Sequence, residues 1–138
     1  MSEVEIGNNK IRGFGALIYN LLAPLNETDK FKKKFEDTHV KILINAINVN
    51  FAALIIIDNG ELRVESIPNK PKENLKKKNI GWDGFLQMDS QIFLAFVMNR
   101  MSLLGIAKKW IIRKIKLQGI SKLLYLLKLV KILMNNNN

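Results

Sequence analysis

Residues 83–133 read DGFLQMDSQIFLAFVMNRMSLLGIAKKWIIRKIKLQGISKLLYLLKLVKIL, a series of apolar runs separated by short breaks. The first run, 83–88, predicts a buried strand because it is short and rich in large apolar side chains. A helix is expected over 90–98. The side chain of Asp89 or Ser90 can cap this helix, because it can accept a hydrogen bond from a free backbone amide of the first turn.

The rest of this stretch repeats the order of strand and helix. A second helical piece is expected over 102–109, and the alternating residues 111–117 predict a basic strand. Its lysines should face water and its apolar side chains the interior (Ile111, Ile115 and Leu117). Gly119 breaks the strand, and a leucine-rich closing helix is expected over 120–134.

The closing helix has more apolar surface than a single buried face requires. On a helical wheel, one arc lies opposite Lys128 and Lys131 and contains Leu123, Leu126, Leu127, Val130, Leu133 and Met134. Three further apolar residues lie beyond that arc (Leu124, Leu129 and Ile132). This surplus indicates a cavity for an apolar ligand.

The N-terminal third is expected to be helical. Apolar residues recur at helical spacing over 11–25, and Pro24 should bend or end that helix because its ring removes a backbone donor. A second helical turn is expected over 26–35, with Phe31 and Phe35 on one face.

The middle of the chain predicts β structure. The runs 40–49 and 52–58 are rich in β-branched residues. Along the first run the polar residues change from odd-numbered to even-numbered positions, which predicts a bulge or bend near Ala46. Asn59-Gly60 can supply the positive φ angles of a hairpin turn, and 61–67 alternates beyond it. One face of the sheet should therefore contact water. The following residues, 68–78, contain two prolines and several lysines and predict a mobile loop.

Length and composition indicate one globular domain. Of the 138 residues, 48% are hydrophobic and 25% are charged, which suffices for a single core. We assign the domain to 11–134, with a flexible arm over 1–10 and a disordered tail over 135–138. Cysteine is absent, which excludes disulfides and thiolate chemistry. Because neither a signal peptide nor an uninterrupted apolar span is recognisable, a soluble, cytoplasmic protein is expected.

The formal net charge is +10, and no acidic residue follows Asp89. This half of the chain should attract polyanions, either an anionic membrane surface or nucleic acid, although a solvated lysine-rich face explains the pattern equally well. Nucleic-acid binding has the weaker support of the two, because the sequence has no zinc-finger spacing, helix-turn-helix or aromatic-studded strand pair.

The sequence gives no indication of catalysis. The sole histidine, His39, has no second imidazole with which to share a metal, and neither a phosphate-binding Gly-rich loop nor an activated serine is recognisable. Asp83 and Asp89 flank a predicted strand, but turn and capping roles account for both. We therefore expect a binding protein without catalytic residues, metal or cofactor.

Residues 85–102, FLQMDSQIFLAFVMNRMS, combine an apolar strand, an acidic or Ser cap and a Phe-Leu pair, and 114–119, KIKLQG, is a lysine-rich strand that ends at Gly. In these motifs, and in the order of elements from about 35 to 133, the chain resembles the sterol carrier protein-2 (SCP-2) sterol-transfer family. At two positions where the family commonly has glycine, this chain has another residue. One is Asn99, and Asn tolerates the left-handed region of backbone conformation. The other is Arg113, which alters the expected path of the strand.

The resemblance implies an α+β domain whose helices cover a five-stranded, mixed and mostly antiparallel sheet and enclose an apolar tunnel. It also implies non-covalent binding and intermembrane transfer of a lipid, such as a sterol, fatty acid, acyl-CoA, isoprenoid or phospholipid. No active site is implied.

Eight apolar residues are candidates to line a lipid site between the closing helix and the sheet: Phe93, Phe96, Val97, Leu103, Leu104, Trp110, Leu123 and Leu127. Each can equally be an ordinary core residue, as apolar residues at helical spacing usually are. Opening should require the closing helix or 68–78 to move. Lys108, Lys109 and Lys114 are candidates to hold the protein transiently against an anionic membrane.

One alternative function follows from the same residues. If the cavity is filled by the protein's own side chains, the domain is a protein-interaction or dimerisation module. The sequence is compatible with a monomer or a weak dimer.

Overall fold

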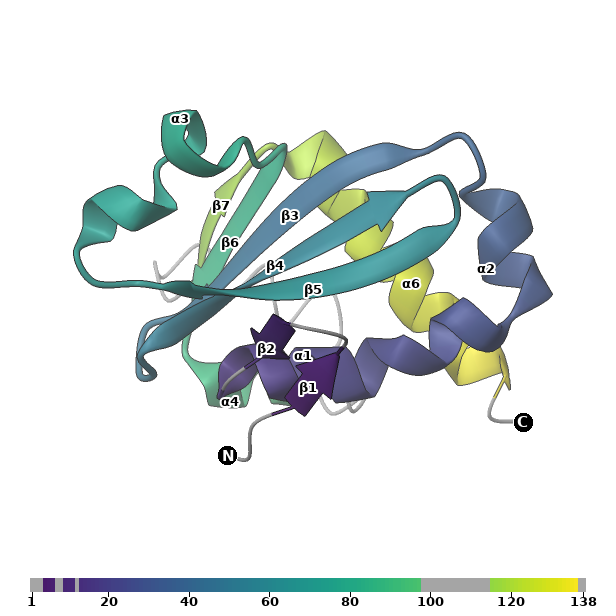
Figure 1. The fold of residues 1–138 in the computed structure, drawn as a ribbon, viewed down its shortest axis with the longest axis horizontal. Coiled ribbons are helices and arrows are strands. Elements are labelled where there is room, and N and C mark those ends of the chain that lie inside the picture. Colours follow the sequence, from purple (N-terminus) through teal and green to yellow (C-terminus); the bar gives the residue numbers. More distant parts are fainter. Residues whose placement is uncertain (1–3, 7–8, 12, 98–114, 137–138) are drawn as a thin grey trace.

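The structure is a computed structural model that describes residues 4–6, 9–11, 13–97 and 115–136, with side chains described for 13–93 and 115–133. Five strands form one mixed sheet in the order β5-β4-β3-β6-β7 (Figure 1). They are β3 (His39–Ala46), β4 (Phe51–Asp58), β5 (Glu61–Pro68), β6 (Gly84–Met88) and β7 (Lys116–Gln118). All neighbouring strands are antiparallel except β3 and β6. The predicted α+β fold with a mostly antiparallel five-stranded sheet is confirmed.

The first three strands of this sheet follow the sequence prediction. Asn59 and Gly60 have φ angles of 51° and 80°, so β4 and β5 are joined by a tight hairpin turn. Leu62 and Val64 of β5 are buried, and the charged residues that alternate with them are exposed. β3 ends at Ala46, where the sequence predicts a bulge or bend, and a turn then leads to β4.

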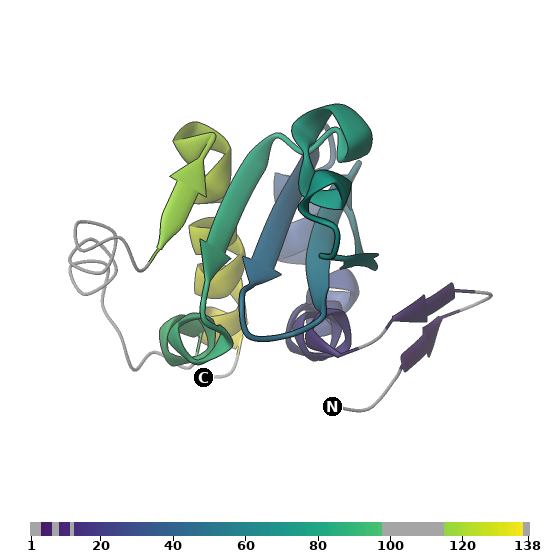
Figure 2. The same cartoon turned by 90° about the vertical axis from the view of Figure 1, so that its left-hand side faces the viewer.

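Helical segments supply the apolar layer on one face of the sheet (Figures 1 and 2). They are α1 (Phe14–Leu22), the 3₁₀ helix η1 (Ala23–Glu27), α2 (Asp29–Lys34), α4 (Ser90–Val97) and α6 (Ile120–Asn136). Pro24 lies at the start of η1, so the α-helix ends before it, as predicted. Phe31 and Phe35 are buried with their ring centroids 5.2 Å apart, which confirms their shared face.

The opposite face contacts water at Glu61, Arg63 and Glu65, as predicted, but another part of it is covered. The segment 69–82 crosses it and contains the 3₁₀ helix η2 (Lys72–Leu75) and the helical turn α3 (Lys77–Ile80) (Figure 2). Leu75 and Trp82 pack there against apolar residues of β3, β4 and β6. Residues 68–78 are thus not an irregular loop, because Leu75 anchors them on the sheet.

The first residues contain structure that the sequence analysis missed. β1 (Val4–Ile6) and β2 (Asn9–Ile11) pair as an antiparallel hairpin, separate from the five-stranded sheet (Figure 2). The helix predicted from residue 11 begins only at Phe14, because residues up to 11 belong to this hairpin. Each strand has three residues, too few for alternation to be recognised in the sequence.

The buried face of α6 differs from the predicted arc. Leu123 and Leu126 are buried as predicted, but Leu129 and Ile132 are buried too, whereas Leu127 is only half-buried. The helix begins against β6 and ends near η1 and α2 (Figure 1). Its successive turns are therefore covered from different directions. As a result the buried side chains are three residues apart along the helix and do not form one straight stripe.

Asp83 and Asp89 have the turn and capping roles that the sequence predicts. Asp83 Oδ2 accepts a hydrogen bond from the Lys41 N–H (2.9 Å), and the Asp83 N–H donates to the Lys41 carbonyl oxygen (2.7 Å). These bonds hold the start of β6 beside β3. Asp89 Oδ1 accepts from the Gln91 N–H (2.8 Å) at the start of α4.

The predicted helix over 102–109 and most of the predicted strand over 111–117 lie outside the described residues. In the part of that strand that is described, Ile115 is buried, Leu117 is half-buried and Lys116 is exposed, as predicted. Among the described helices, none combines the length and the apolar character needed to cross a membrane.

Candidate functional site

The two faces of the sheet bury different kinds of side chain. Between the helices and the sheet, the described core consists of apolar residues. The two buried polar residues of the described part, Asn45 and Asn69, both line a groove on the opposite face. The helical face is therefore suited to hydrocarbon, and the opposite face to a ligand that forms hydrogen bonds.

Three of the predicted lipid-site residues lie in the described part of the helical face. Phe93 of α4 is buried and meets Phe14 of α1 edge to face, with ring centroids 5.6 Å apart. Leu123 of α6 is buried and packs over Gly84 of β6. Leu127, one turn further along α6, is half-buried. These residues come from two helices on one side of the sheet, and a role in lipid binding stays a prediction.

The remaining predicted residues lie outside the described side chains. Phe96 and Val97 belong to α4, but only their backbone is described. Residues 98–114 are outside the described part altogether, and they include Leu103, Leu104 and Trp110 as well as the predicted membrane contacts Lys108, Lys109 and Lys114.

The structure corrects one feature of the predicted site. The sequence predicts that either the closing helix or residues 68–78 move to open the lipid site. Leu75 of this segment packs on the face of the sheet opposite α6, so the segment does not border a site between α6 and the sheet.

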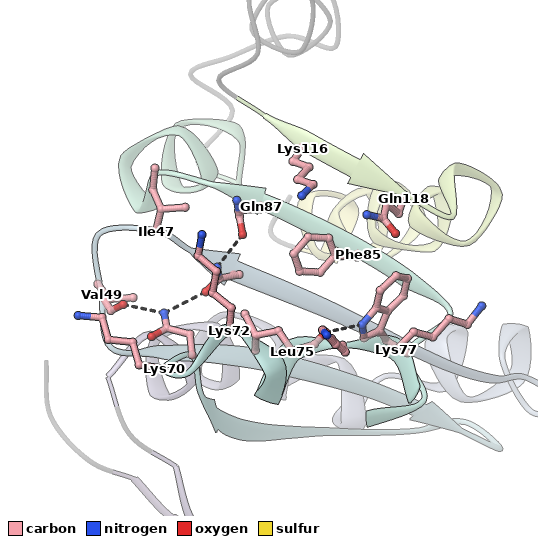
Figure 3. Close-up of a pocket in the computed structure, with 14 residues that line it drawn as sticks. Ile47, Val49, Lys70, Lys72, Leu75, Lys77, Phe85, Gln87, Lys116 and Gln118 are labelled. Carbon is pink, nitrogen blue, oxygen red and sulfur yellow. Dashed lines mark hydrogen bonds between the residues drawn. The ribbon is translucent and has the colours of Figure 1, made fainter. Parts of the chain in front are cut away.

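A groove of about 690 Å³ lies on that opposite face, between the segment 69–77 and β7 (Figure 3). We call it the sheet groove. Paired strand residues form its floor, because Gln87 of β6 is in register with Asn45 of β3 and Lys116 of β7. The described residues that line it are Asn45, Ile47, Val49, Asn69, Lys70, Lys72, Leu75, Lys76, Lys77, Trp82, Phe85, Gln87, Lys116 and Gln118.

Three side-chain amides form a chain of hydrogen bonds in the sheet groove (Figure 3). Asn69 Nδ2 donates to the Val49 carbonyl oxygen (2.7 Å) and to Asn45 Oδ1 (3.0 Å). Asn45 Nδ2 in turn donates to Gln87 Oε1 (2.9 Å). This leaves Asn69 Oδ1, which is buried and has no hydrogen-bond partner among the described residues. An unsatisfied buried acceptor is costly, so a ligand donor that reached this atom, after a shift of the side chains that cover it, would be favoured.

One end of the sheet groove is aromatic. The rings of Trp82 and Phe85 stack with centroids 5.4 Å apart. Trp82 Nε1 donates to the Leu75 carbonyl oxygen (2.8 Å), and Lys77 Nζ lies 5.7 Å from the centre of the Trp82 ring. These contacts hold the segment 69–82 against the sheet and fix one wall of the groove.

The lining of the sheet groove is strongly cationic. Among the described residues that line the groove, five are lysines and none is acidic (Lys70, Lys72, Lys76, Lys77 and Lys116). Figure 3 shows Lys116 along one side and Lys70 and Lys72 along the other, with Gln87 and Phe85 between them. The groove therefore favours a negatively charged ligand.

The sheet groove was not predicted from the sequence. Four of its lysines lie in the segment that was predicted to be a loop, and the fifth lies in β7, so nothing in the sequence connects them. The available signal was the presence of Asn45 and Gln87 within strands that are otherwise apolar. Asn45 contributed to the prediction of a bulge or bend near Ala46, but not to that of a site.

His39 lies on the protein surface beside Asp58 and Arg63. Its Nδ1 lies 2.8 Å from Asp58 Oδ1, and Arg63 Nη2 lies 3.9 Å from the other Asp58 oxygen. All three side chains are exposed, and such pairs contribute little to stability. Within the described part of the chain, no group of three or more His, Asp and Glu side chains could hold a metal ion.

No protein-family model matches the sequence, and no curated protein matches it. Its structure is similar to that of the UbiJ-SCP2 ubiquinone synthesis protein, with a TM-score of 0.61 and 10% identity over 89% of this chain and 96% of that one. It is also similar to a double mutant of the sec-alkyl sulfatase PisA1, with a TM-score of 0.55 and 15% identity. That match covers 75% of this chain but only 14% of the sulfatase chain. The likeness to an almost complete SCP2 domain agrees with the order of elements in the sequence, and the chain has an SCP2-like fold.

Proposed function

We propose that this chain is a lipid-binding domain that carries its ligand non-covalently and without catalysis. The observation that supports this most directly is the apolar layer between helices and sheet in a chain with an SCP2-like fold. A hydrocarbon tail inserted there displaces no buried polar group of the described residues. Its burial would contribute about 25 cal/mol per Å² of apolar surface removed from water.

The hydrocarbon tail is proposed to lie between α6 and the sheet. Phe93, Leu123 and Leu127 are the described residues assigned to it. The sequence adds Phe96, Val97, Leu103, Leu104 and Trp110 as further candidates. Movement of α6 away from β6 would open the site. Sterols, fatty acids, acyl-CoAs, isoprenoids and phospholipids all contain the apolar part that this layer can bury.

Added volume at Leu127 tests this location. Leu127→Trp should weaken the binding of a fluorescent fatty acid by about tenfold or more, because the indole ring would occupy space needed by the tail. The matched control is Leu124→Trp on the same helix, since Leu124 is 49% exposed. Equal affinities of the two variants, measured by fluorescence titration, would contradict a site beside Leu127.

We further propose that basic residues hold the protein against an anionic membrane during intermembrane transfer. The sequence assigns this role to Lys108, Lys109 and Lys114. The outer side of α6 adds support, because Ile120, Leu124, Lys128 and Lys131 are all exposed there. Apolar and basic side chains on one helix face suit a membrane surface.

Charge reversal tests the membrane contact. Changing Lys108, Lys109 and Lys114 together to glutamate should abolish co-sedimentation with anionic vesicles at low salt, since each lysine near the surface contributes about 1 kcal/mol. Changing Lys30, Lys32 and Lys33 of α2 to glutamate alters the net charge by the same amount. If both triple variants sediment alike, net charge alone explains the binding.

A protein-interaction or dimerisation module with a filled core is the second candidate function. It is favoured by the close packing of the described helical face, where Phe93 and Leu123 are 5% and 9% exposed. Size-exclusion chromatography with light scattering, combined with the fatty-acid titration, separates the two candidates. A bare protein that self-associates and binds no fatty acid would support the module.

A further inference from the structure

We propose that the sheet groove is a second binding site, for a small organic phosphate that carries hydroxyl groups beside its phosphate. The inference is independent of the proposed lipid function, because the groove and the apolar layer lie on opposite faces of the sheet. It stands on three observations: the charge of the groove, one buried acceptor and the shape of the groove.

The charge of the groove selects an anion. Lys72 and Lys76 belong to the segment that crosses the sheet, and Lys116 belongs to β7, so cationic side chains line opposite sides (Figure 3). In the described part of the lining, no carboxylate neutralises them. Phosphate is a suitable partner because it accepts several charge-assisted hydrogen bonds at once from separate lysines.

The buried acceptor selects a ligand that also donates. Asn69 is 8% exposed, and its Nδ2 is committed to Val49 and Asn45. The orientation of the amide is thereby set, with Oδ1 lacking a partner in the described part of the chain. The phosphate group of an organic monoester, as its dianion, has no proton to donate to this oxygen. A hydroxyl group on the carbon skeleton of an organic phosphate does.

The shape of the groove selects a small molecule over a macromolecule. Its volume of about 690 Å³ lies within the range of small-molecule sites, about 300 to 1,000 Å³. Single-stranded RNA would need open aromatic faces for base stacking, but Trp82 and Phe85 are each only 7% exposed. A flat membrane surface contacts raised parts of a protein more readily than the floor of a groove, where Asn45 and Gln87 lie.

Calorimetric titration with glycerol 3-phosphate tests the proposal on the full chain. Changing Lys72, Lys76 and Lys116 to glutamine should weaken binding by about tenfold or more. The control variant changes Lys30, Lys32 and Lys33 of α2, which are also exposed, to glutamine. Both triples lower the formal net charge from +10 to +7, so the control should retain wild-type affinity.

A second comparison uses the unmodified protein and isolates the buried acceptor. Propyl phosphate has the phosphate and three-carbon chain of glycerol 3-phosphate but lacks its hydroxyl groups. It should bind about threefold to tenfold more weakly, the value of one net hydrogen bond. Equal affinities would overturn the role of Asn69 Oδ1.

Other results would overturn the proposal as a whole. One is the absence of any binding of glycerol 3-phosphate to the wild-type protein at millimolar concentration. Another is equal weakening in both triple variants, which would show a general effect of net charge. A third is that the wild type binds anionic vesicles or an RNA oligonucleotide but neither organic phosphate, and that the groove variant loses this binding. Failure of the fatty-acid titration would leave these measurements unaffected.

Discussion

Replacing Gly119 with alanine should lower the free energy of unfolding by about 2 to 5 kcal/mol. Gly119 joins β7 to α6 with a φ of +68°, a region that costs other L-residues about 1 to 2 kcal/mol. A Cβ at this position would also overlap the Asp83 carbonyl oxygen, so the backbone of one segment would have to move. Overpacking of this kind typically costs about 1 to 3 kcal/mol more.

Gly81 provides the matched control for this change. Its φ is +77°, but a Cβ there would meet nothing within 4 Å. Gly81→Ala should therefore cost only the conformational term, about 1 to 2 kcal/mol. Urea unfolding followed by circular dichroism measures both variants. A Gly119→Ala protein as stable as the Gly81→Ala protein would contradict the close contact between Gly119 and Asp83.

Truncating Leu129 to alanine should lower the free energy of unfolding by about 2 to 5 kcal/mol, the usual cost of a cavity in a packed core. Leu129 is 0% exposed, although the helical wheel places it outside the apolar arc of α6. The prediction thus tests how α6 is rotated against the rest of the protein.

Leu124 is the control on the same helix. It is 49% exposed, so Leu124→Ala should change stability by no more than about 0.5 kcal/mol. The comparison is again made by urea denaturation. Similar losses in the two variants would mean that α6 does not bury the face described for it.

The sequence predicts this fold best where a local signal has one physical meaning. Pro24 ends an α-helix wherever the surroundings place it, and Asn59-Gly60 supplies two positive φ angles without help from other residues. The capping of α4 by Asp89 is equally local. Such signals fixed the order of elements and led to the resemblance that the fold comparison supports.

The errors arise where distant residues decide the outcome. A helical wheel assumes a single covering surface, but α6 is covered by the sheet at its start and by η1 and α2 further on, which buries Leu129 and Ile132. The segment 68–78 has little apolar character of its own, and Leu75 anchors it only because an apolar face of the sheet is available.

The sheet groove was missed for a related reason. Its floor is built by β3, β6 and β7, and the parallel pairing of β3 with β6 is what brings Asn45 beside Gln87. Residues 42 positions apart give no local signal of that hydrogen bond. Four of the five lysines come from a separate segment, 69–77, and net charge alone does not reveal where they gather.

Native mass spectrometry of the protein as purified, followed by organic extraction and identification of any released molecule, tests lipid binding most directly. The proposed function predicts a lipid in stoichiometric amount, which organic solvent releases from the protein. A protein that is bare in the spectrometer and also fails to bind a fluorescent fatty acid would contradict it, and would favour the interaction module with a filled core.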